Sequence, residues 1–154
     1  MQFANYFFAS IISFLGLAIG FMLIKIAPEE QQQLMKYFSF AKKFLLLLIS
    51  IFLIFHYSYN SLYILGLIAC CMLLLYIDKK IKDITKKSML IYLILGFLFF
   101  LSSKDTSLFV LVSSLILLYG MFNSSMLEMK PGVYGKFLAN NAIFILTANI
   151  PLFL

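Results

Sequence analysis

The chain has 154 residues, of which 64% are hydrophobic and only 12% are charged, and its formal net charge is +6. A soluble domain of this size has too small an interior to bury that much apolar surface, since ordinary domains are nearer half apolar and a quarter charged. Because long apolar stretches recur along the whole chain, we predict an all-α polytopic membrane protein with a single domain over residues 1–154.

All twelve basic residues are lysines, and they stand at the ends of the apolar stretches. They form no basic domain with a face that could read bases, so a nucleic-acid partner is excluded despite the positive charge. The expected partners are membrane lipids and other membrane protein chains, in a homo- or hetero-oligomer.

Six apolar segments can be marked out as candidate transmembrane helices, of which the fourth is the shortest. Several are short, since seventeen helical residues cover roughly 25 Å, slightly less than a typical hydrocarbon core. Lysines at the helix ends can reach the headgroups and compensate for this. The predicted spans are residues 3–26, 38–57, 61–77, 88–101, 107–122 and 137–154.

The distribution of lysine predicts the orientation of these spans. Eleven lysines flank or fill the first, third and fifth loops, and only Lys104 lies in an even-numbered loop. Basic residues accumulate in cytoplasmic loops, so these three loops are predicted to be cytoplasmic and both termini external. The six helices then form three hairpins joined by brief outer turns.

The first loop reads "IAPEEQQQLMKYF" and is unusually polar. Pro28 either ends the first helix or begins the second, and Glu29 and Glu30 would then lie in a first turn whose dipole favours negative charge. We interpret residues 28–36 as a hairpin turn in which the two glutamates form a cytoplasmic contact surface.

Small residues recur at helical spacing in two spans. Such residues let helix backbones approach closely, either within one chain or between chains. The first seam contains Ala9, Ser13, Gly16 and Gly20, and the second contains Thr106, Ser113 and Gly120.

The last span is the only one that carries several amides. Asn140, Asn141, Thr147 and Asn149 interrupt its apolar run, and Asn140 and Thr147 are seven residues apart and therefore share a face. Amides in lipid must find partners, so this polar face is predicted to contact another helix or, alternatively, to line a substrate path.

Few residues offer catalytic or metal-binding chemistry. All six carboxylates fall in loops, the single histidine, His56, lies where the second span meets the outer surface, and the adjacent Cys70 and Cys71 point in different directions. We therefore predict no catalytic, metal or cofactor site, and no enzyme. The third loop, "IDKKIKDITKKS", has the pattern of a short amphipathic helix at the headgroups, although a solvated linker explains it equally well.

The "IAPEE" sequence, followed by Lys36-Tyr37-Phe38 and a leucine run, resembles small uncharacterised archaeal polytopic membrane proteins. The resemblance covers about thirty residues around the first hairpin. It implies a lineage and brings no activity or site residues.

Three functions are compatible with these features. The first is a non-enzymatic structural or accessory subunit of a membrane assembly. The second is a small uncoupled transporter or channel, with the polar face of the last helix along its path. The third is an immunity-type or regulatory membrane protein that binds a partner helix.

Overall fold

The computed structural model describes residues 3–57, 61–81, 83–127 and 133–149, which are almost entirely helical and contain no strand. The helices are α1 (Phe3–Ile26), α2 (Pro28–His56), α3 (Ser61–Lys80), α4 (Ile84–Ser102), α5 (Thr106–Ser124), α6 (Val133–Asn141) and α7 (Ile143–Asn149).

Four helices are long and apolar enough to cross a membrane, which confirms the all-α class and a chain suited to a bilayer. They are α1, most of α2, α4 and α5. The predicted third span is helical as α3, but its apolar part within the described residues is the shorter segment Ile64–Leu74. The predicted sixth span differs, because it is divided into α6 and α7 at Ala142, and residues 150–154 lie outside the described part.

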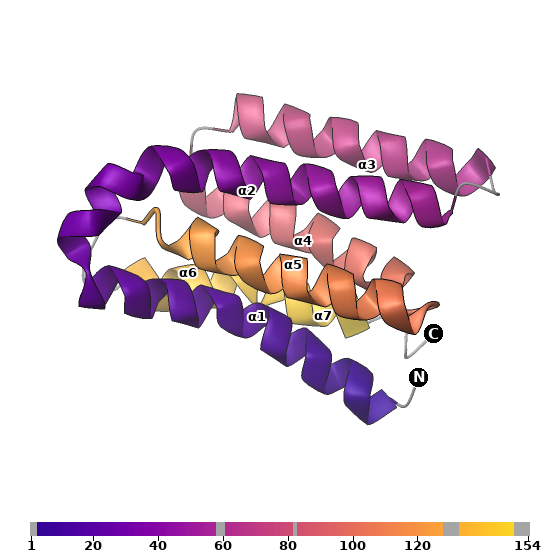
Figure 1. Cartoon of the computed structure of the whole chain (residues 1–154), viewed down its shortest axis with the longest axis horizontal. Coiled ribbons are helices and arrows are strands. Elements are labelled where there is room, and N and C mark those ends of the chain that lie inside the picture. The colour runs from indigo at the N-terminus through magenta and orange to yellow at the C-terminus, as the bar shows by residue number, and fades with distance from the viewer. Residues whose placement is uncertain (1–2, 58–60, 82, 128–132, 150–154) are drawn as a thin grey trace.

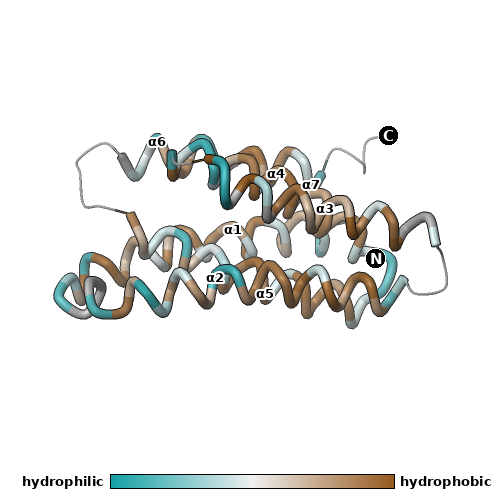
Figure 2. Tube along the Cα trace, turned by 90° about the horizontal axis from the view of Figure 1, so that it is seen from above, coloured by the Kyte–Doolittle hydropathy of each residue, from teal (hydrophilic) through white to brown (hydrophobic). Residues whose placement is uncertain are grey.

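The helices pack in two layers (Figure 1, Figure 2). One layer holds α1, α5 and α2 with α5 at its centre, and the other holds α3, α4 and the α6–α7 pair with α4 at its centre. The most extensive contacts join α1 to α5 and α4 to α7, so the main packing partners are far apart in the sequence. The predicted hairpins are therefore not the packing units of the bundle.

The two ends of the bundle differ in charge. Helices α1, α3 and α5 end, and helices α2, α4 and α6 begin, at one end of the bundle, at the left of Figure 1. Lysines flank these helix ends in the sequence, and we call this the lysine-rich end. Helix α1 begins and α7 ends at the opposite end, where the Tyr6 hydroxyl donates to the carbonyl oxygen of Ala148 at 2.6 Å.

The two seams of small residues pack against each other. The Ser13 hydroxyl donates to the carbonyl oxygen of Ser113 at 3.1 Å. A Cβ atom on Gly16 would lie 2.1 Å from the carbonyl oxygen of Leu117, and one on Gly120 would lie 3.0 Å from the backbone nitrogen of Leu17. Helices α1 and α5 are thus parallel and in backbone contact, and the seams serve packing within this chain.

An aromatic cluster fills the core towards the end opposite the lysines. The Tyr6 ring lies 5.1 Å from Phe99 and 5.5 Å from Phe109, and Phe99 lies 5.6 Å from Phe144. These rings come from α1, α4, α5 and α7, and their pairs are tilted, stacked and edge-on in turn, where stacked and edge-on arrangements are those that aromatic pairs favour. The cluster therefore joins both layers.

Two predicted loops are mostly helix. Only Ala27 separates α1 from α2, which begins at Pro28, so the proline does start the second helix but the segment after it continues as helix instead of a turn. The third loop forms no separate amphipathic helix, because α3 runs to Lys80 and α4 begins at Ile84 after the capping residue Asp83. The Asp83 side chain accepts hydrogen bonds from the backbone of Thr85 and Lys86, which explains where α4 starts.

Asp105 caps α5 in the same way at the opposite end of the bundle. Its side chain accepts hydrogen bonds from the backbone nitrogens of Ser107 at 2.8 Å and Leu108 at 3.0 Å, and from the Ser107 hydroxyl. The Ser107 hydroxyl, followed by the Leu108 N–H, lowers the pKa of Asp105 below its ordinary value.

We expect Gly16→Ala to destabilise the bundle by about 1–3 kcal/mol, because the new methyl group meets backbone that cannot move independently of α5. Thermal unfolding in mild detergent, followed by circular dichroism, measures this. Gly66→Ala is the matched control: no atom lies within 4 Å of its added Cβ, so the helix is expected to gain up to about 1 kcal/mol. Equal melting temperatures for the two variants would show that α1 and α5 are not in backbone contact.

We expect Asp105→Asn to reduce the acid sensitivity of folding. A carboxyl group whose pKa is lowered in the folded state stabilises the fold above its unfolded pKa, and this contribution is lost as the pH falls through the folded pKa. The wild-type chain is therefore expected to exceed the variant in stability at neutral pH, with the difference closing below about pH 4. Melting curves of both chains across the acidic range test this, and a difference that does not change with pH would contradict it.

Candidate functional site

Four buried polar side chains form a continuous hydrogen-bonded chain across the bundle. The Lys42 amine donates to Asn123 Oδ1 at 3.3 Å, and Asn123 Nδ2 donates to Ser88 Oγ at 2.7 Å. The Ser88 hydroxyl donates to Asn141 Oδ1 at 2.8 Å. Lys42 is 8% exposed and the other three are 3% or less, so this polar chain lies inside the protein.

Each member of the polar chain comes from a different helix. Lys42 lies on α2 and Asn123 on α5 in one layer, while Ser88 lies on α4 and Asn141 on α6 in the other. The polar chain thus connects the two layers near the lysine-rich end. Asn123 lies one residue before the end of α5, and Ser88 lies four residues after the start of α4.

Helical spacing explains why Ser88 and Asn123 face inward. Ser88 precedes the fully buried Tyr92 by four residues, and Asn123 follows the fully buried Tyr119 by four residues. The Tyr92 and Tyr119 rings lie 5.7 Å apart at the contact between α4 and α5. Residues four apart share a helix face, so the aromatic contact brings the serine and the asparagine together.

The polar chain has one direction and one ionisable member. Hydrogen bonds run from the lysine amine through amide, hydroxyl and amide, and Asn141 Nδ2 ends the series by donating to the carbonyl oxygen of Phe137 at 2.8 Å. Neutral side-chain amides do not readily accept and pass on protons, so this arrangement does not provide a proton path. It orients a buried amine and holds four helices in a fixed relation.

The burial of Lys42 differs from the prediction made from the sequence. The lysine pattern predicts that Lys42 flanks the first loop at a membrane boundary. In the structure Lys42 is buried within α2, in the segment Gln33–His56 that is apolar enough to span, and its neighbour Lys43 is exposed. Ionisable groups inside such bundles are rare and mark functional positions by default.

The polar residues of the last predicted span do not form one continuous face. The Asn141 side chain bonds back to the carbonyl of Phe137, four residues earlier, which is also the normal acceptor for the backbone N–H of residue 141. The helix breaks at the next residue, Ala142. Asn140 and Thr147 have different surroundings, since Asn140 lines an open groove and Thr147 packs against Gly96 of α4.

The four predicted polar residues instead contact different parts of the bundle. Asn141 belongs to the polar chain, while Asn149 donates to the Ser10 hydroxyl of α1 at 3.2 Å. The Thr147 hydroxyl donates to the carbonyl oxygen of Ile143 in its own helix. It also packs closely against Gly96 of α4, since a Cβ atom added to Gly96 would lie 2.0 Å from Thr147 Oγ1. Asn140 is half-buried and lines an open groove, described below.

The other predicted positions are separate from the polar chain. Glu29 is exposed at the start of α2, and Glu30 follows it in the first turn, although its side chain is outside the described set. The exposed His56 ring packs edge-on to Tyr57 at 5.1 Å. Cys70 and Cys71 are free and half-buried. Among the described residues, no three His, Cys, Asp or Glu side chains are placed to hold a metal ion.

Sequence reasoning did not single out Ser88 or Asn123, and it gave Lys42 only a topological role. Ser88 was the first residue of a predicted span and Asn123 followed the last residue of another, so both resembled boundary residues. A usable signal was present in the buried helical spacing Ile116, Tyr119, Asn123 and in Ser88, Tyr92, Leu95. In each series a polar residue lies on the same helix face as buried apolar residues, which indicates that the polar side chain is buried too.

The chain matches no known protein family, no curated protein and no solved structure. The resemblance of the first hairpin to archaeal membrane proteins therefore stays a prediction.

We expect Ser88→Ala to destabilise the bundle by about 1–3 kcal/mol, because it leaves the Asn123 amide and the Asn141 carbonyl without their buried partner. Ser114→Ala is the control, since the exposed Ser114 hydroxyl bonds only to its own helix, at the carbonyl of Val110. Thermal unfolding in one detergent measures both variants. A loss no larger for Ser88→Ala than for Ser114→Ala would show that the polar chain does not hold the layers together.

Proposed function

We propose that this protein is a non-enzymatic integral membrane protein that acts as a structural or accessory subunit of a membrane assembly. Its four apolar helices are suited to cross the bilayer, with α3 and the α6–α7 pair completing six segments. The lysine-rich end is proposed to face the cytoplasm, with both termini external, because lysine accumulates on that side.

The observation that supports this proposal is the use of the interior polar groups. Asn123, Ser88 and Asn141 are bonded to one another across the helices, and Asn149 is bonded to Ser10. Polar side chains committed to such contacts stabilise a bundle and do not line a solute path. A protein built in this way acts through its surface, so contact with other membrane components is its means of function.

The seams of small residues no longer argue for a partner chain, because α1 and α5 use them on each other. The argument for a partner therefore moves to the lysine-rich end. There the exposed Glu29 lies in the first turn of α2, at an end of the bundle where lysines predominate. An acidic first turn at this end suits a partner with a basic or amide-rich surface.

A small transporter is the second candidate, and the observation that favours it is Lys42. A buried amine inside an apolar segment is typical of sites that bind or move charged solutes. Flux assays in proteoliposomes separate the two functions. The subunit function predicts flux no higher than in empty liposomes, whereas a transporter predicts flux that Lys42→Met abolishes.

We expect the full chain, released from native membranes in lipid nanodiscs, to retain a second membrane protein, so that the protein complex freed of lipid and scaffold has a mass larger than the 17.7 kDa of one chain. Glu29→Ala combined with Glu30→Ala is expected to lower the retained partner about fivefold or more, the effect of losing about 1 kcal/mol of charge contact. Gln33→Ala, an exposed and uncharged change on the same helix, is the control.

Two results would contradict the subunit function. The first is a monomer without any bound membrane protein in every preparation. The second is equal retention of the partner by the glutamate double variant and by Gln33→Ala, which would show that the first turn of α2 does not contact the partner.

A further inference from the structure

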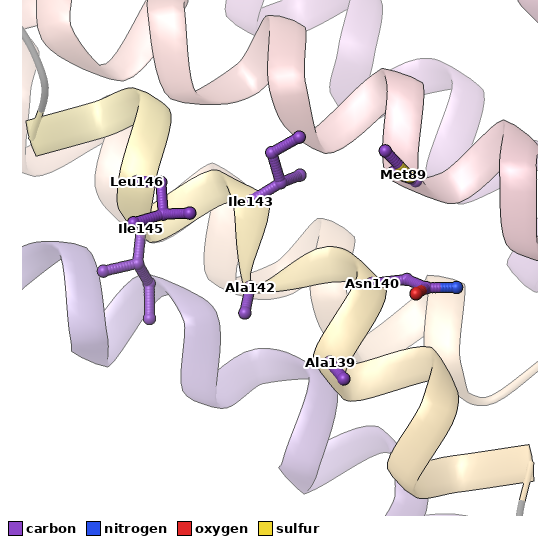
Figure 3. Close-up of a pocket in the computed structure, with 7 residues that line it drawn as sticks. All are labelled: Met89, Ala139, Asn140, Ala142, Ile143, Ile145 and Leu146. Carbon is purple, nitrogen blue, oxygen red and sulfur yellow. The ribbon is translucent and has the colours of Figure 1, made fainter.

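We propose that a groove beside the junction of α6 and α7 binds an anionic glycerophospholipid. The groove has a volume of about 510 Å³ and is open to the surroundings of the bundle (Figure 3). It is lined by Met89, Ala139, Asn140, Ala142, Ile143, Ile145 and Leu146. The inference rests on the proposal that the bundle spans a membrane.

The groove lies where the last span is divided into α6 and α7. Asn141 turns into the bundle to bond with Ser88, while its neighbour Asn140 lines the groove outside. The helix then restarts as α7, whose Ala148 and Phe144 are fully buried while Leu146 remains 65% exposed. One side of α7 is therefore packed in the core and the other faces the groove.

The lining is graded in polarity along its length. Asn140 and Met89 lie at one end of the groove, and Ile145 and Leu146 lie at the other (Figure 3). Asn140 is the only polar side chain among the lining residues, and its amide offers both a donor and an acceptor. From Asn140 to Leu146 the wall extends about 9 Å along the helix direction, with an aliphatic lining.

Positive charge continues this gradient beyond the amide. Lys136 precedes Asn140 by four residues on α6, and Lys86 precedes Met89 by three residues on α4. Both lysines are exposed, and both spacings place the lysine on the same helix face as the groove residue, one turn closer to the lysine-rich end.

The order of lysines, amide and aliphatic wall matches the order of groups in a phospholipid. The lysines suit the phosphate and an anionic headgroup, the Asn140 amide suits the glycerol-ester level, and the aliphatic wall suits the start of an acyl chain. A partner helix would need no pair of cations at one end. The charge pattern therefore selects an anionic lipid as the occupant.

The chain contains no tryptophan, so a single introduced tryptophan reports its own surroundings. Leu146→Trp places it in the groove, and Leu47→Trp is a matched control on α2, where Leu47 is 55% exposed. Each position lies five residues beyond a member of the polar chain, Asn141 or Lys42, and thus at a similar distance from the lysine-rich end. Both variants are reconstituted in phosphatidylcholine vesicles with a minor fraction of brominated phosphatidylglycerol or brominated phosphatidylcholine.

We expect brominated phosphatidylglycerol to quench Leu146→Trp more strongly than brominated phosphatidylcholine does, and the two lipids to quench Leu47→Trp equally. Adding Lys136→Gln or Lys86→Gln to Leu146→Trp is expected to weaken the relative association of phosphatidylglycerol by about fivefold each. Lys25→Gln, an exposed lysine at the same end on α1, is expected to leave it unchanged.

Equal quenching of Leu146→Trp by the two lipids would overturn the proposal, as would an effect of Lys25→Gln as large as that of the groove lysines. Absence of quenching at Leu146→Trp alone would show that protein covers the groove, which also overturns it. If neither tryptophan is quenched, the bundle is not in the bilayer and the proposed membrane function itself fails.

Discussion

The polar chain from Lys42 to Asn141 is the interaction on which the arrangement of the bundle depends. The aromatic and aliphatic contacts between layers are non-directional and would tolerate sliding, whereas hydrogen bonds of 2.7–2.8 Å at Ser88 define one register between α4, α5 and α6. In a lipid environment apolar surfaces gain little by facing each other instead of acyl chains, so directional bonds and close packing carry more of the specificity.

The second constraint is the close approach of α1 and α5. Because Gly16 and Gly20 have no side chain, the backbones meet, and this contact fixes where α5 lies in its layer. Helix α5 in turn presents Asn123 to α2 and α4. The polar chain therefore depends on the contact between α1 and α5, because that contact positions the helix that carries Asn123.

These constraints together shape the surface that is available for function. Asn141, one residue before the division between α6 and α7 at Ala142, is needed inside by Ser88, and its side chain also bonds to the carbonyl oxygen of Phe137. The groove beside Asn140 lies at that division. Two adjacent asparagines thus have different roles. Asn141 makes a contact inside the bundle, and Asn140 lines the proposed lipid-binding groove outside it.

Composition and pattern were sufficient for the class of protein and for the helices. Apolar run length depends only on neighbouring residues, so the helical segments and the start of a helix at Pro28 could be predicted. Small residues at helical spacing likewise marked Gly16 and Gly120 as contact positions. The tertiary structure decided three further features: which surface each seam contacts, the burial of Lys42 and the break at Ala142. Each of them depends on residues more than 50 positions away in the sequence. A lysine near a helix end has the same sequence signature whether it reaches the headgroups or an asparagine on another helix.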